Sequence, residues 1–399
     1  MKRGVVKFTF LGIGLFILLF LILFIPEGKS NPDTGVTNCT TLTTSGERYF
    51  LSNDILNNQI TDNCINISAS NIVLDCQGHY IYSIQNYSGV YSNSTNTTIK
   101  NCNITVGSGG NANANGIYLN GVSSSNSTIF NNSVFGDSYT GIYVRTSSNN
   151  NITLNTGVSN SSYGFSLSSS SNNILTSNNW TSNSSYGIYL LGSNNNTLIS
   201  NTGVSNSSYG IDLFQSLNNT LISNVGTSIS SYGIYLVLSY GNIFTSNVGT
   251  SISNGGIFIT SQNNTLISNV GTSISSFGIF VNSNNNQLIN NTGLSDSNRG
   301  IYLSLVSNNI LTSNTGVSNS SYGIDLFQSL NNTLISNIGT SNTFYGFSLT
   351  GSSNNTLTSN TGTSNSSMGF SLTDSSSNNI LTSNIGISNS SYGFSLTGS

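Results

Sequence analysis

The feature that most constrains the fold of this chain is a repeat of about 23 residues. From Gly116 onward, a glycine followed by an apolar residue recurs at intervals of 22 to 25 residues. The positions are Gly116, Gly141, Gly164, Gly187, Gly210, Gly233, Gly256, Gly278, Gly300, Gly323, Gly346, Gly369 and Gly393. Each unit reads approximately N-N-T-L-I-S-N-T-G-V-S-N-S-S-Y-G-I-x-L. Short alternating apolar runs separated by Asn, Ser and Gly are typical of brief strands joined by tight turns.

One coil of three short strands has the length of this repeat. Helical repeats are excluded because no unit carries an apolar stripe with a period of 3.6 residues. A leucine-rich repeat needs an L-x-x-L-x-L frame, and a propeller blade is nearly twice as long. We therefore predict an all-β fold, a right-handed parallel β-helix (solenoid) of about 23-residue three-strand coils. About fifteen coils at the usual strand spacing would make a rod of roughly 70 Å.

Columns of equivalent residues run through the repeat. After each glycine, an apolar residue, a variable residue and a second apolar residue follow, and strand alternation predicts that only the variable one points outward. A column of asparagines predicts a ladder of stacked amides. It comprises Asn155, Asn178, Asn201, Asn224, Asn247, Asn269, Asn291, Asn314, Asn337, Asn360 and Asn384. The glycine two residues beyond this Asn is replaced once, by Trp180, and we expect the indole to face solvent because a narrow interior would not hold it.

The amino terminus predicts a membrane segment. Lys2, Arg3 and Lys7 precede an apolar run from Phe8 to Ile25, which is long enough to cross a bilayer. No small-x-small cleavage site follows, so we favour an uncleaved signal anchor over a cleaved signal peptide, with the remainder outside the cell. The predicted domains are an anchor at 1–30, a cap with the first coils at 31–110, and a thirteen-coil repeat region at 111–399.

The four cysteines all follow the predicted anchor. They are Cys39, Cys64, Cys76 and Cys102. An even number in an exported chain predicts disulfides, and three pairings are open. With no CxxC motif and His79 as the single histidine, no metal site is predicted.

A segment of twenty residues, SNSSYGIDLFQSLNNTLISN, occurs at 205–224 and again at 318–337. Each copy carries an aspartate, Asp212 or Asp325, at the variable strand position. Five coils separate the two, so we expect them roughly 24 Å apart. Glycosidases need two carboxylates about 5 to 10 Å apart, so these two are not predicted to be a catalytic pair.

The coils, with 195–201 reading NNTLISN and 186–190 reading YGIYL, resemble β-helix repeats of the NosD-like, carbohydrate-binding and sugar-hydrolase (CASH) type. The stretches 71–78 (NIVLDCQG) and 99–102 (IKNC) are similar to the first coils of exported archaeal surface proteins of that group. The resemblance covers about 39–399. It implies the fold and not the chemistry, because such proteins include hydrolases, lyases, epimerases, copper-maturation factors and proteins without known chemistry.

The charged residues offer no assembled catalytic site. The acids of the repeat region are Asp137, Asp212, Asp296, Asp325 and Asp374, and no two of them form a plausible acid and base pair. Gly78-His79-Tyr80 is an incomplete version of the Gly-His-Gly of pectinases. Copper delivery needs Met, His or Cys, which are scarce here, so NosD-like copper maturation is disfavoured. With charged residues at only 5% of the chain and few bases in the repeats, no nucleic-acid partner and no cofactor are predicted.

The outward column is the candidate ligand-binding face. Its central residues are Tyr189, Asp212, Tyr235, Phe258, Phe280, Tyr302 and Asp325. An exposed file of rings could stack on sugars, with the aspartates accepting hydrogen bonds from hydroxyls; stacking for stability alone is the alternative.

We therefore predict an exported, membrane-anchored rod that acts in cell-surface structure or adhesion, or in glycan binding, without its own catalytic site. The alternative is a polysaccharide-acting hydrolase, lyase or epimerase. Expected partners are the membrane and cell-surface glycans or proteins. The sequence stops in mid-coil at SYGFSLTGS, which predicts either a fragment or an end that associates with another chain.

Overall fold

The computed structural model describes residues 33–56, 62–83, 87–107, 114–137 and 139–397. Residues from Asp33 onward belong to one compact unit. The predicted anchor at 1–30 lies outside the described residues. Within the described ranges, no helix has the length and apolarity that a bilayer crossing requires.

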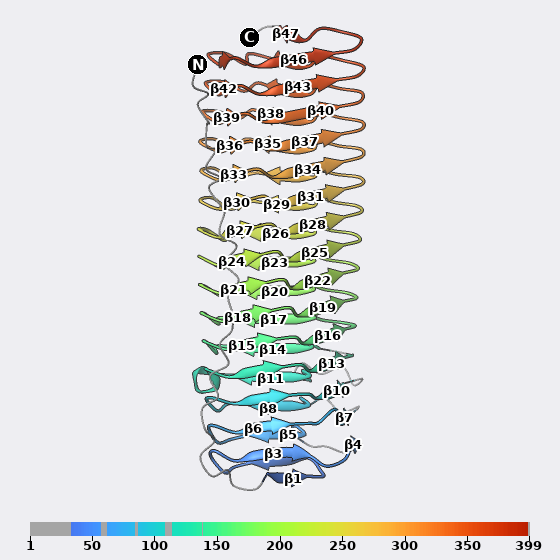
Figure 1. Cartoon of the computed structure of the whole chain (residues 1–399), viewed down its shortest axis with the longest axis vertical. Coiled ribbons are helices and arrows are strands. Elements are labelled where there is room, and N and C mark those ends of the chain that lie inside the picture. Colours follow the sequence, from blue (N-terminus) through green and yellow to red (C-terminus); the bar gives the residue numbers. More distant parts are fainter. Residues whose placement is uncertain (1–32, 57–61, 84–86, 108–113, 138, 398–399) are drawn as a thin grey trace, which may run out of the picture. The chain divides into compact units, whose positions relative to one another are not determined.

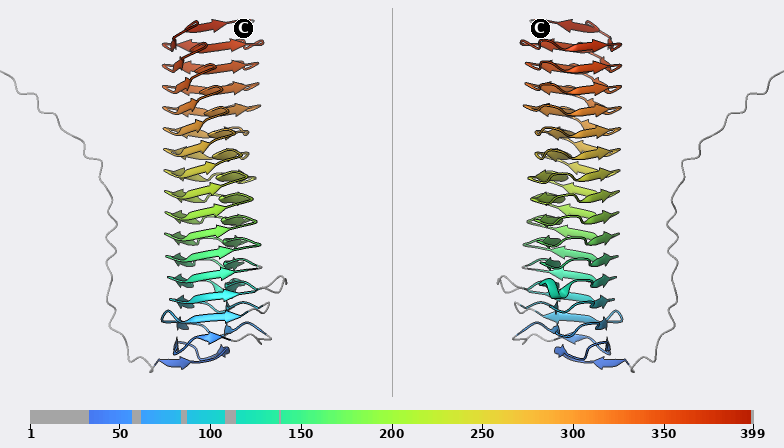
Figure 2. Two further views of the ribbon diagram at one scale, coloured as in Figure 1. Left: turned by 90° about the vertical axis from the view of Figure 1, so that its right-hand side faces the viewer. Right: turned by 90° about the vertical axis from the view of Figure 1, so that its left-hand side faces the viewer.

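The unit is an all-β parallel solenoid, as the repeat predicts. Three short strands per coil stack above their counterparts in the next coil and build three parallel sheets (Figures 1 and 2). The described ranges also contain one 3-10 turn, η1 (Val122–Ser124), after β11.

The first sheet has sixteen strands in the described part of the chain. In order they are β1 (Thr34–Val36), β3 (Arg48–Leu51), β6 (Val73–Asp75), β9 (Thr98–Lys100), β12 (Thr128–Phe130), β15 (Asn151–Thr153), β18 (Ile174–Thr176), β21 (Thr197–Ile199), β24 (Thr220–Ile222), β27 (Ile243–Thr245), β30 (Thr265–Ile267), β33 (Gln287–Ile289), β36 (Ile310–Thr312), β39 (Thr333–Ile335), β42 (Thr356–Thr358) and β45 (Ile380–Thr382).

The second sheet has fifteen described strands. They are β4 (Ile55–Leu56), β7 (Tyr80–Ser83), β10 (Asn103–Val106), β13 (Ser133–Gly136), β16 (Thr156–Ser159), β19 (Asn179–Ser182), β22 (Thr202–Ser205), β25 (Val225–Ser228), β28 (Val248–Ser251), β31 (Val270–Ser273), β34 (Thr292–Ser295), β37 (Thr315–Ser318), β40 (Ile338–Ser341), β43 (Thr361–Ser364) and β46 (Ile385–Ser388).

The third sheet, again with sixteen described strands, carries the candidate ligand-binding face. Its strands are β2 (Thr40–Leu42), β5 (Ile65–Ile67), β8 (Val90–Ser92), β11 (Ile117–Asn120), β14 (Ile142–Arg145), β17 (Phe165–Ser168), β20 (Ile188–Leu191), β23 (Ile211–Phe214), β26 (Ile234–Val237), β29 (Ile257–Ile259), β32 (Ile279–Val281), β35 (Ile301–Ser304), β38 (Ile324–Phe327), β41 (Phe347–Thr350), β44 (Phe370–Thr373) and β47 (Phe394–Leu396).

Each coil fills the core with a mixture of large and small side chains. In one coil, Leu198 of the first sheet and Ile211 and Leu213 of the third are buried. The second sheet contributes Gly203, whose Cβ, if it had one, would lie 2.4 Å from the carbonyl oxygen of Gly210. A glycine is therefore needed here because the second sheet passes close to the backbone that enters the third.

Trp180 occupies this glycine position, and our expectation that its indole faces solvent is wrong. The side chain is fully buried, and its ring packs against Phe165 with centroids 5.1 Å apart. An added Cβ on Gly157, the equivalent residue one coil earlier, would lie 2.3 Å from the indole ring. The indole ring thus fills the space next to the glycine of the neighbouring coil. Strand alternation along β19 points the Trp180 side chain inward.

The asparagine ladder runs along the interior of the solenoid. The Asn224 amide donates to Oδ1 of Asn247 at 3.0 Å and to the Leu198 carbonyl at 2.8 Å. Its own Oδ1 accepts from the backbone N–H and the side-chain amide of Asn201, at 2.9 and 3.0 Å. The same pattern joins the predicted members Asn201, Asn224, Asn247, Asn269, Asn291, Asn314 and Asn337. Each amide therefore links three successive coils.

A second asparagine ladder was not predicted. Asn196 donates to Asn219 at 3.1 Å, and Asn219 to Asn242 at the same distance. In both ladders, a residue with positive φ precedes the ladder asparagine, as Asn195 (φ 56°) precedes Asn196 and Ser200 (φ 54°) precedes Asn201. Asn tolerates this left-handed conformation better than most residues, which explains the Asn-Asn pair in each repeat.

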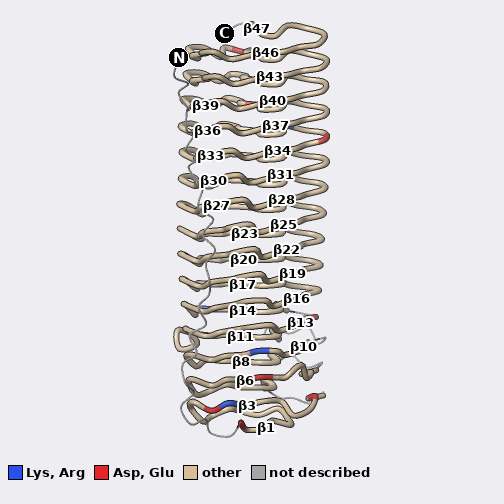
Figure 3. The backbone as a smooth tube through the Cα atoms, in the orientation of Figure 1, with Lys and Arg blue, Asp and Glu red and all other residues tan. Residues whose placement is uncertain are grey.

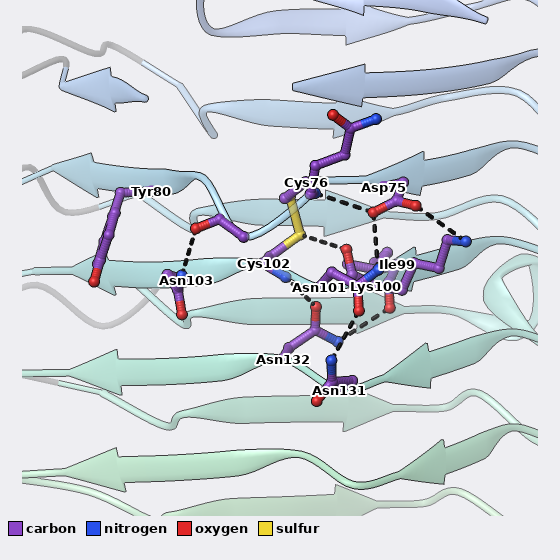
Figure 4. Close-up of a disulfide and its surroundings, with 12 residues drawn as sticks. Asp75, Cys76, Tyr80, Ile99, Lys100, Asn101, Cys102, Asn103, Asn131 and Asn132 are labelled. Carbon is purple, nitrogen blue, oxygen red and sulfur yellow. Dashed lines mark hydrogen bonds and ion pairs between the residues drawn. A yellow bond between two sulfur atoms is a disulfide. The ribbon is translucent and has the colours of Figure 1, made fainter. Parts of the chain in front are cut away.

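The cysteines form two disulfides that each link successive coils. Cys39 is joined to Cys64 and Cys76 to Cys102, with sequence separations of 25 and 26 residues. Next to the second disulfide, the Cys102 N–H donates to Oδ1 of Asn132 at 3.0 Å (Figure 4). The Asn132 amide in turn donates to Asn155. The first asparagine ladder thus extends one coil below its predicted start and ends against the disulfide.

We predict that Asn224→Ala lowers the free energy of unfolding by at least about 3 kcal/mol, because the Asn201 amide groups and the Leu198 carbonyl lose buried partners. Urea unfolding followed by circular dichroism measures the change. The matched control is Asn206→Ala, which removes an exposed bond of 2.9 Å to Asn183 of the preceding coil and should cost less than about 0.5 kcal/mol. Equal losses in the two variants would contradict the structural role of the ladder.

Candidate functional site

The predicted ligand-binding residues form one file along the third sheet. The strand register pairs Tyr189 with Asp212, Asp212 with Tyr235, and so on through Phe258, Phe280 and Tyr302 to Asp325. We call this file the strand column. Five strand steps, from β23 to β38, separate Asp212 from Asp325. The two carboxylates therefore lie in different coils and cannot act on one substrate atom.

A second file of rings covers the strand column. It is formed by the residues directly before the repeat glycines from Gly164 to Gly346, and we call it the turn column. Its members are Tyr163, Tyr186, Tyr209, Tyr232, Phe277, Tyr322 and Tyr345, interrupted by Gly255 and Arg299. Ring centroids across the two columns lie close together, at 4.8 Å for Tyr186 and Tyr189 and 4.7 Å for Tyr209 and Tyr235. The two columns together are the aromatic face.

Because of this cover, the prediction of a bare, exposed file is wrong. Asp212 and Asp325 are 3% and 1% exposed, and Phe258 is 9% exposed. Tyr189, Tyr235, Phe280 and Tyr302 are half-buried. The tyrosine of the S-S-Y-G motif, which recurs in the repeat, is the sequence signal for the turn column. With the turn column in this conformation, neither aspartate is open to a ligand on the surface.

Asp325 is paired within the chain. The Arg299 guanidinium donates from Nε to Oδ2 of Asp325 at 2.9 Å. Its carbon atom lies 4.6 Å from the ring centroid of Tyr302, 5.3 Å from that of Tyr322 and 5.9 Å from that of Phe277. Burial raises the pKa of Asp325, and Arg299 opposes that shift. This arrangement is an arginine stacked between rings over a buried carboxylate.

Asp212 has the same sequence around it but no such partner. Tyr186 occupies the place that Arg299 has beside Asp325, 26 residues before the aspartate in both cases. Oδ1 lacks a hydrogen-bond donor in both aspartates among the described residues, so the contrast lies in the arginine that pairs with Oδ2 of Asp325. Burial raises the pKa of the Asp212 carboxyl well above its usual range. Burial raises the pKa of Tyr189, and the nearby charge of Asp212 raises this pKa further.

A cleft of about 300 Å³ opens at Ser166, one coil before the first residue of the strand column, Tyr189. Ser166 stands between Tyr143 and Tyr189 in the register, and the small side chain leaves the space between their rings unfilled. The cleft is lined by Tyr118, Tyr139, Tyr143, Tyr163, Tyr189 and Arg145, together with hydroxyl and amide side chains. This combination of ring faces and hydrogen-bonding groups is typical of small-molecule sites.

The other acids of the repeat region have separate surroundings. Asp137 accepts from Asn160 at 2.6 Å, and Asp296 accepts from Asn319 at 3.0 Å, while Asp374 lies in a turn with positive φ. His79 contacts Asp54 in the first coils, with 3.0 Å between Nδ1 and Oδ1. In the described ranges, no three His, Cys, Asp or Glu side chains gather as a metal site would require. Charged residues concentrate in the coils from β1 to β10 (Figure 3).

The sequence profile of the right-handed β-helix region matches residues 42–202, 115–271 and 255–399. These overlapping matches cover most of the chain, which therefore belongs to the right-handed β-helix family. The predicted handedness agrees with this family. In the comparison with curated protein sequences, no protein matches.

Several solved structures share the fold at low identity. The Dettilon tailspike protein is 14% identical, with 88% of this chain and 62% of the tailspike chain covered and a TM-score of 0.33. DFA-IIIase from Arthrobacter chlorophenolicus, solved with GF2, is 11% identical, with coverages of 76% and 81% and a TM-score of 0.37. A variant of the periplasmic alginate epimerase AlgG is 13% identical, with coverages of 88% and 77% and a TM-score of 0.37. The chain thus spans less than two thirds of the tailspike, and the likeness concerns the fold alone.

We predict that Asp212→Asn stabilises the protein increasingly as the pH rises above about 4, the pKa of an unfolded aspartate. The folded-state pKa of Asp212 is raised, so the native state holds its proton more tightly than the unfolded state. Stability is therefore lost as the pH rises from the unfolded toward the folded pKa, and the amide removes that loss. At neutral pH the gain should be about 1 to 3 kcal/mol.

Thermal and urea unfolding between pH 3 and pH 8 measure this difference. The comparison variant is Asp325→Asn, which leaves the Arg299 guanidinium without its carboxylate and should give a smaller gain or a loss. A stability difference for Asp212→Asn that is flat, or that falls with rising pH, would show that the carboxyl has a partner in solution.

Proposed function

We propose that this protein is a membrane-anchored rod outside the cell that binds surface glycans along the aromatic face and has no catalytic site of its own. Within the right-handed β-helix family we assign it to the NosD-like, CASH type, an assignment that rests on the repeat sequence. The anchor, the location and the glycan partner are parts of the proposal.

The observation that carries the proposal is the aromatic face with its cleft at Ser166. Sugar rings present C–H groups on one face, and these pack on flat aromatic side chains, while tyrosine hydroxyls and neighbouring serines offer hydrogen bonds to sugar hydroxyls. The half-buried rings of Tyr189 and Tyr235 are held in place by the turn column, so little side-chain entropy would be lost on binding. The cleft volume of about 300 Å³ is at the lower end of ligand pockets and suits a short oligosaccharide segment.

The regular stacking of the coils also supports an adhesive role. A solenoid presents equivalent residues at a regular spacing along one face, and a polymer can contact several coils at once. Weak contacts at each coil then add to a useful total affinity.

We predict that Tyr189→Ala and Tyr235→Ala each weaken glycan binding about two- to tenfold, which corresponds to roughly 0.5 to 1.5 kcal/mol for one ring contact. A glycan array identifies the ligand, and titration calorimetry of the best binder measures the change. The matched control is Tyr240→Ala, an exposed tyrosine outside both columns in the turn after β26, and it should leave binding unchanged.

Glycan affinity that is unchanged in both Tyr189→Ala and Tyr235→Ala would contradict the aromatic face as the binding surface. An array without any bound glycan would contradict the proposal in favour of a purely structural rod. Release of reducing ends or of unsaturated sugars from a polysaccharide would instead support the enzyme alternative.

A further inference from the structure

The two copies of the repeated twenty-residue segment provide an internal comparison. Asp212 and Asp325 sit at the same position of the third sheet, on β23 and β38, and both are at least nine-tenths buried. The surroundings differ at one decisive point, which is the turn-column residue 26 positions earlier. It is Arg299 for Asp325 and Tyr186 for Asp212.

The three rings around Arg299 have counterparts around Asp212, whereas Asn298, which accepts from Arg299 at 3.0 Å, is replaced by Ser185, and Ser348 beside Asp325 is replaced by Tyr235. Arg299 stacks on Phe277, Tyr302 and Tyr322. The equivalent rings in the earlier copy are Tyr163, Tyr189 and Tyr209, and Tyr186 packs on these same three rings. The Asp212 site thus has the rings and the buried carboxylate of a guanidinium site, and it lacks the guanidinium.

An arginine from elsewhere in the described part of the chain does not fill this position. Of the lysines and arginines there, Arg48, Lys100 and Arg299 pair with Asp33, Asp75 and Asp325. Arg145 lies on β14, three strand steps from β23. A positive charge for Asp212 would have to come from outside the described residues.

We infer that the Asp212 site binds a guanidinium group, the side chain of an arginine presented by a partner protein. The guanidinium would stack on the rings of Tyr163, Tyr189 and Tyr209 and pair with the Asp212 carboxylate, as Arg299 does in the second copy. Entry requires the half-buried Tyr186 ring to turn toward solvent, a change of side-chain rotamer that leaves the backbone in place. Guanidinium is favoured over ammonium because its flat, weakly hydrated group stacks on rings while it donates to a carboxylate.

This inference shares the rings of Tyr163 and Tyr189 with the proposed sugar contacts at the cleft. Asp212 belongs to the guanidinium site alone, so Asp212→Asn separates a failure of this inference from a failure of glycan binding. A partner protein that carries an exposed arginine could be held at Asp212 whether or not the rod binds sugars.

The test uses the whole chain and two probes, N-acetyl-arginine methylamide and a blocked peptide with one central arginine. Binding is followed by calorimetry and by NMR of labelled tyrosine rings. We expect one bound arginine per chain, tighter binding of the peptide than of the single residue, and at least tenfold weaker binding of the lysine analogues.

Two variants use the internal copy as a guide. Tyr186→Arg places an arginine where Arg299 stands in the second copy, so the chain should fill its own site and binding should be lost. Arg299→Ala should open the second site and raise the stoichiometry from one to two. Asp212→Asn should weaken binding by at least tenfold, and its fold is checked by circular dichroism.

Several outcomes would overturn the inference. One is binding that survives in Tyr186→Arg and Asp212→Asn, and another is no binding to the parent chain together with none to Arg299→Ala. Preferred binding of the lysine analogue or of glucosamine would overturn the assignment to guanidinium. Dimerisation in the ultracentrifuge that is lost in Arg145→Gln would show that a second copy of this chain, and not another protein, supplies the arginine.

Discussion

The buried asparagine ladder is the interaction on which the rest of this structure depends. A parallel solenoid with so few charged residues has to satisfy polar groups at every turn of its interior, and each ladder amide does so by linking three successive coils. The same bonds fix the register, because an amide shifted by one residue would point away from the core. Once the register is fixed, equivalent residues of successive coils lie above one another. Both columns of the aromatic face, and the contrast between Asp212 and Asp325, follow from that alignment.

Much of this architecture could be predicted from the sequence because the repeat makes the chain its own alignment. The period of about 23 residues, the Gly-apolar-x-apolar strand and the asparagine column indicate three strands per coil, and the solenoid has them. The error about the aspartates arose because strand alternation alone does not show which turn residues fold over a strand. Asp212 does alternate outward from Ile211 and Leu213, yet rings from the turn column cover it. Trp180 was misplaced because its size was weighed against an average interior, whereas a glycine in the neighbouring coil makes room for it. Side-chain cover depends on how turns fold back, and a linear pattern does not report that.

The aromatic face combines two properties that usually occur apart. Its rings stack at about 5 Å along the sheet, and beneath them Asp325 pairs with Arg299, whereas Asp212 has no charged partner among the described residues. Rigid rings suit the binding of sugars, and an unpaired buried carboxylate suits a cation. The repeated segment puts both aspartates at the same strand position, and Arg299 in the place of Tyr186 gives Asp325 alone a charged partner among the described residues. The family has many chemistries on one scaffold, so function here has to be argued from this face and not from the fold.

The central claim, that position along the solenoid is counted in coils, can be measured directly. Spin labels at exposed turn positions, in the double variants Ser207→Cys with Ser320→Cys and Ser207→Cys with Ser390→Cys, probe separations of five and eight strand steps. Double electron-electron resonance should give distances of about 24 Å and about 38 Å, in the ratio of the coil numbers. Two similar distances, or a longer sequence separation that gives the shorter distance, would contradict in-register stacking and every assignment built on it.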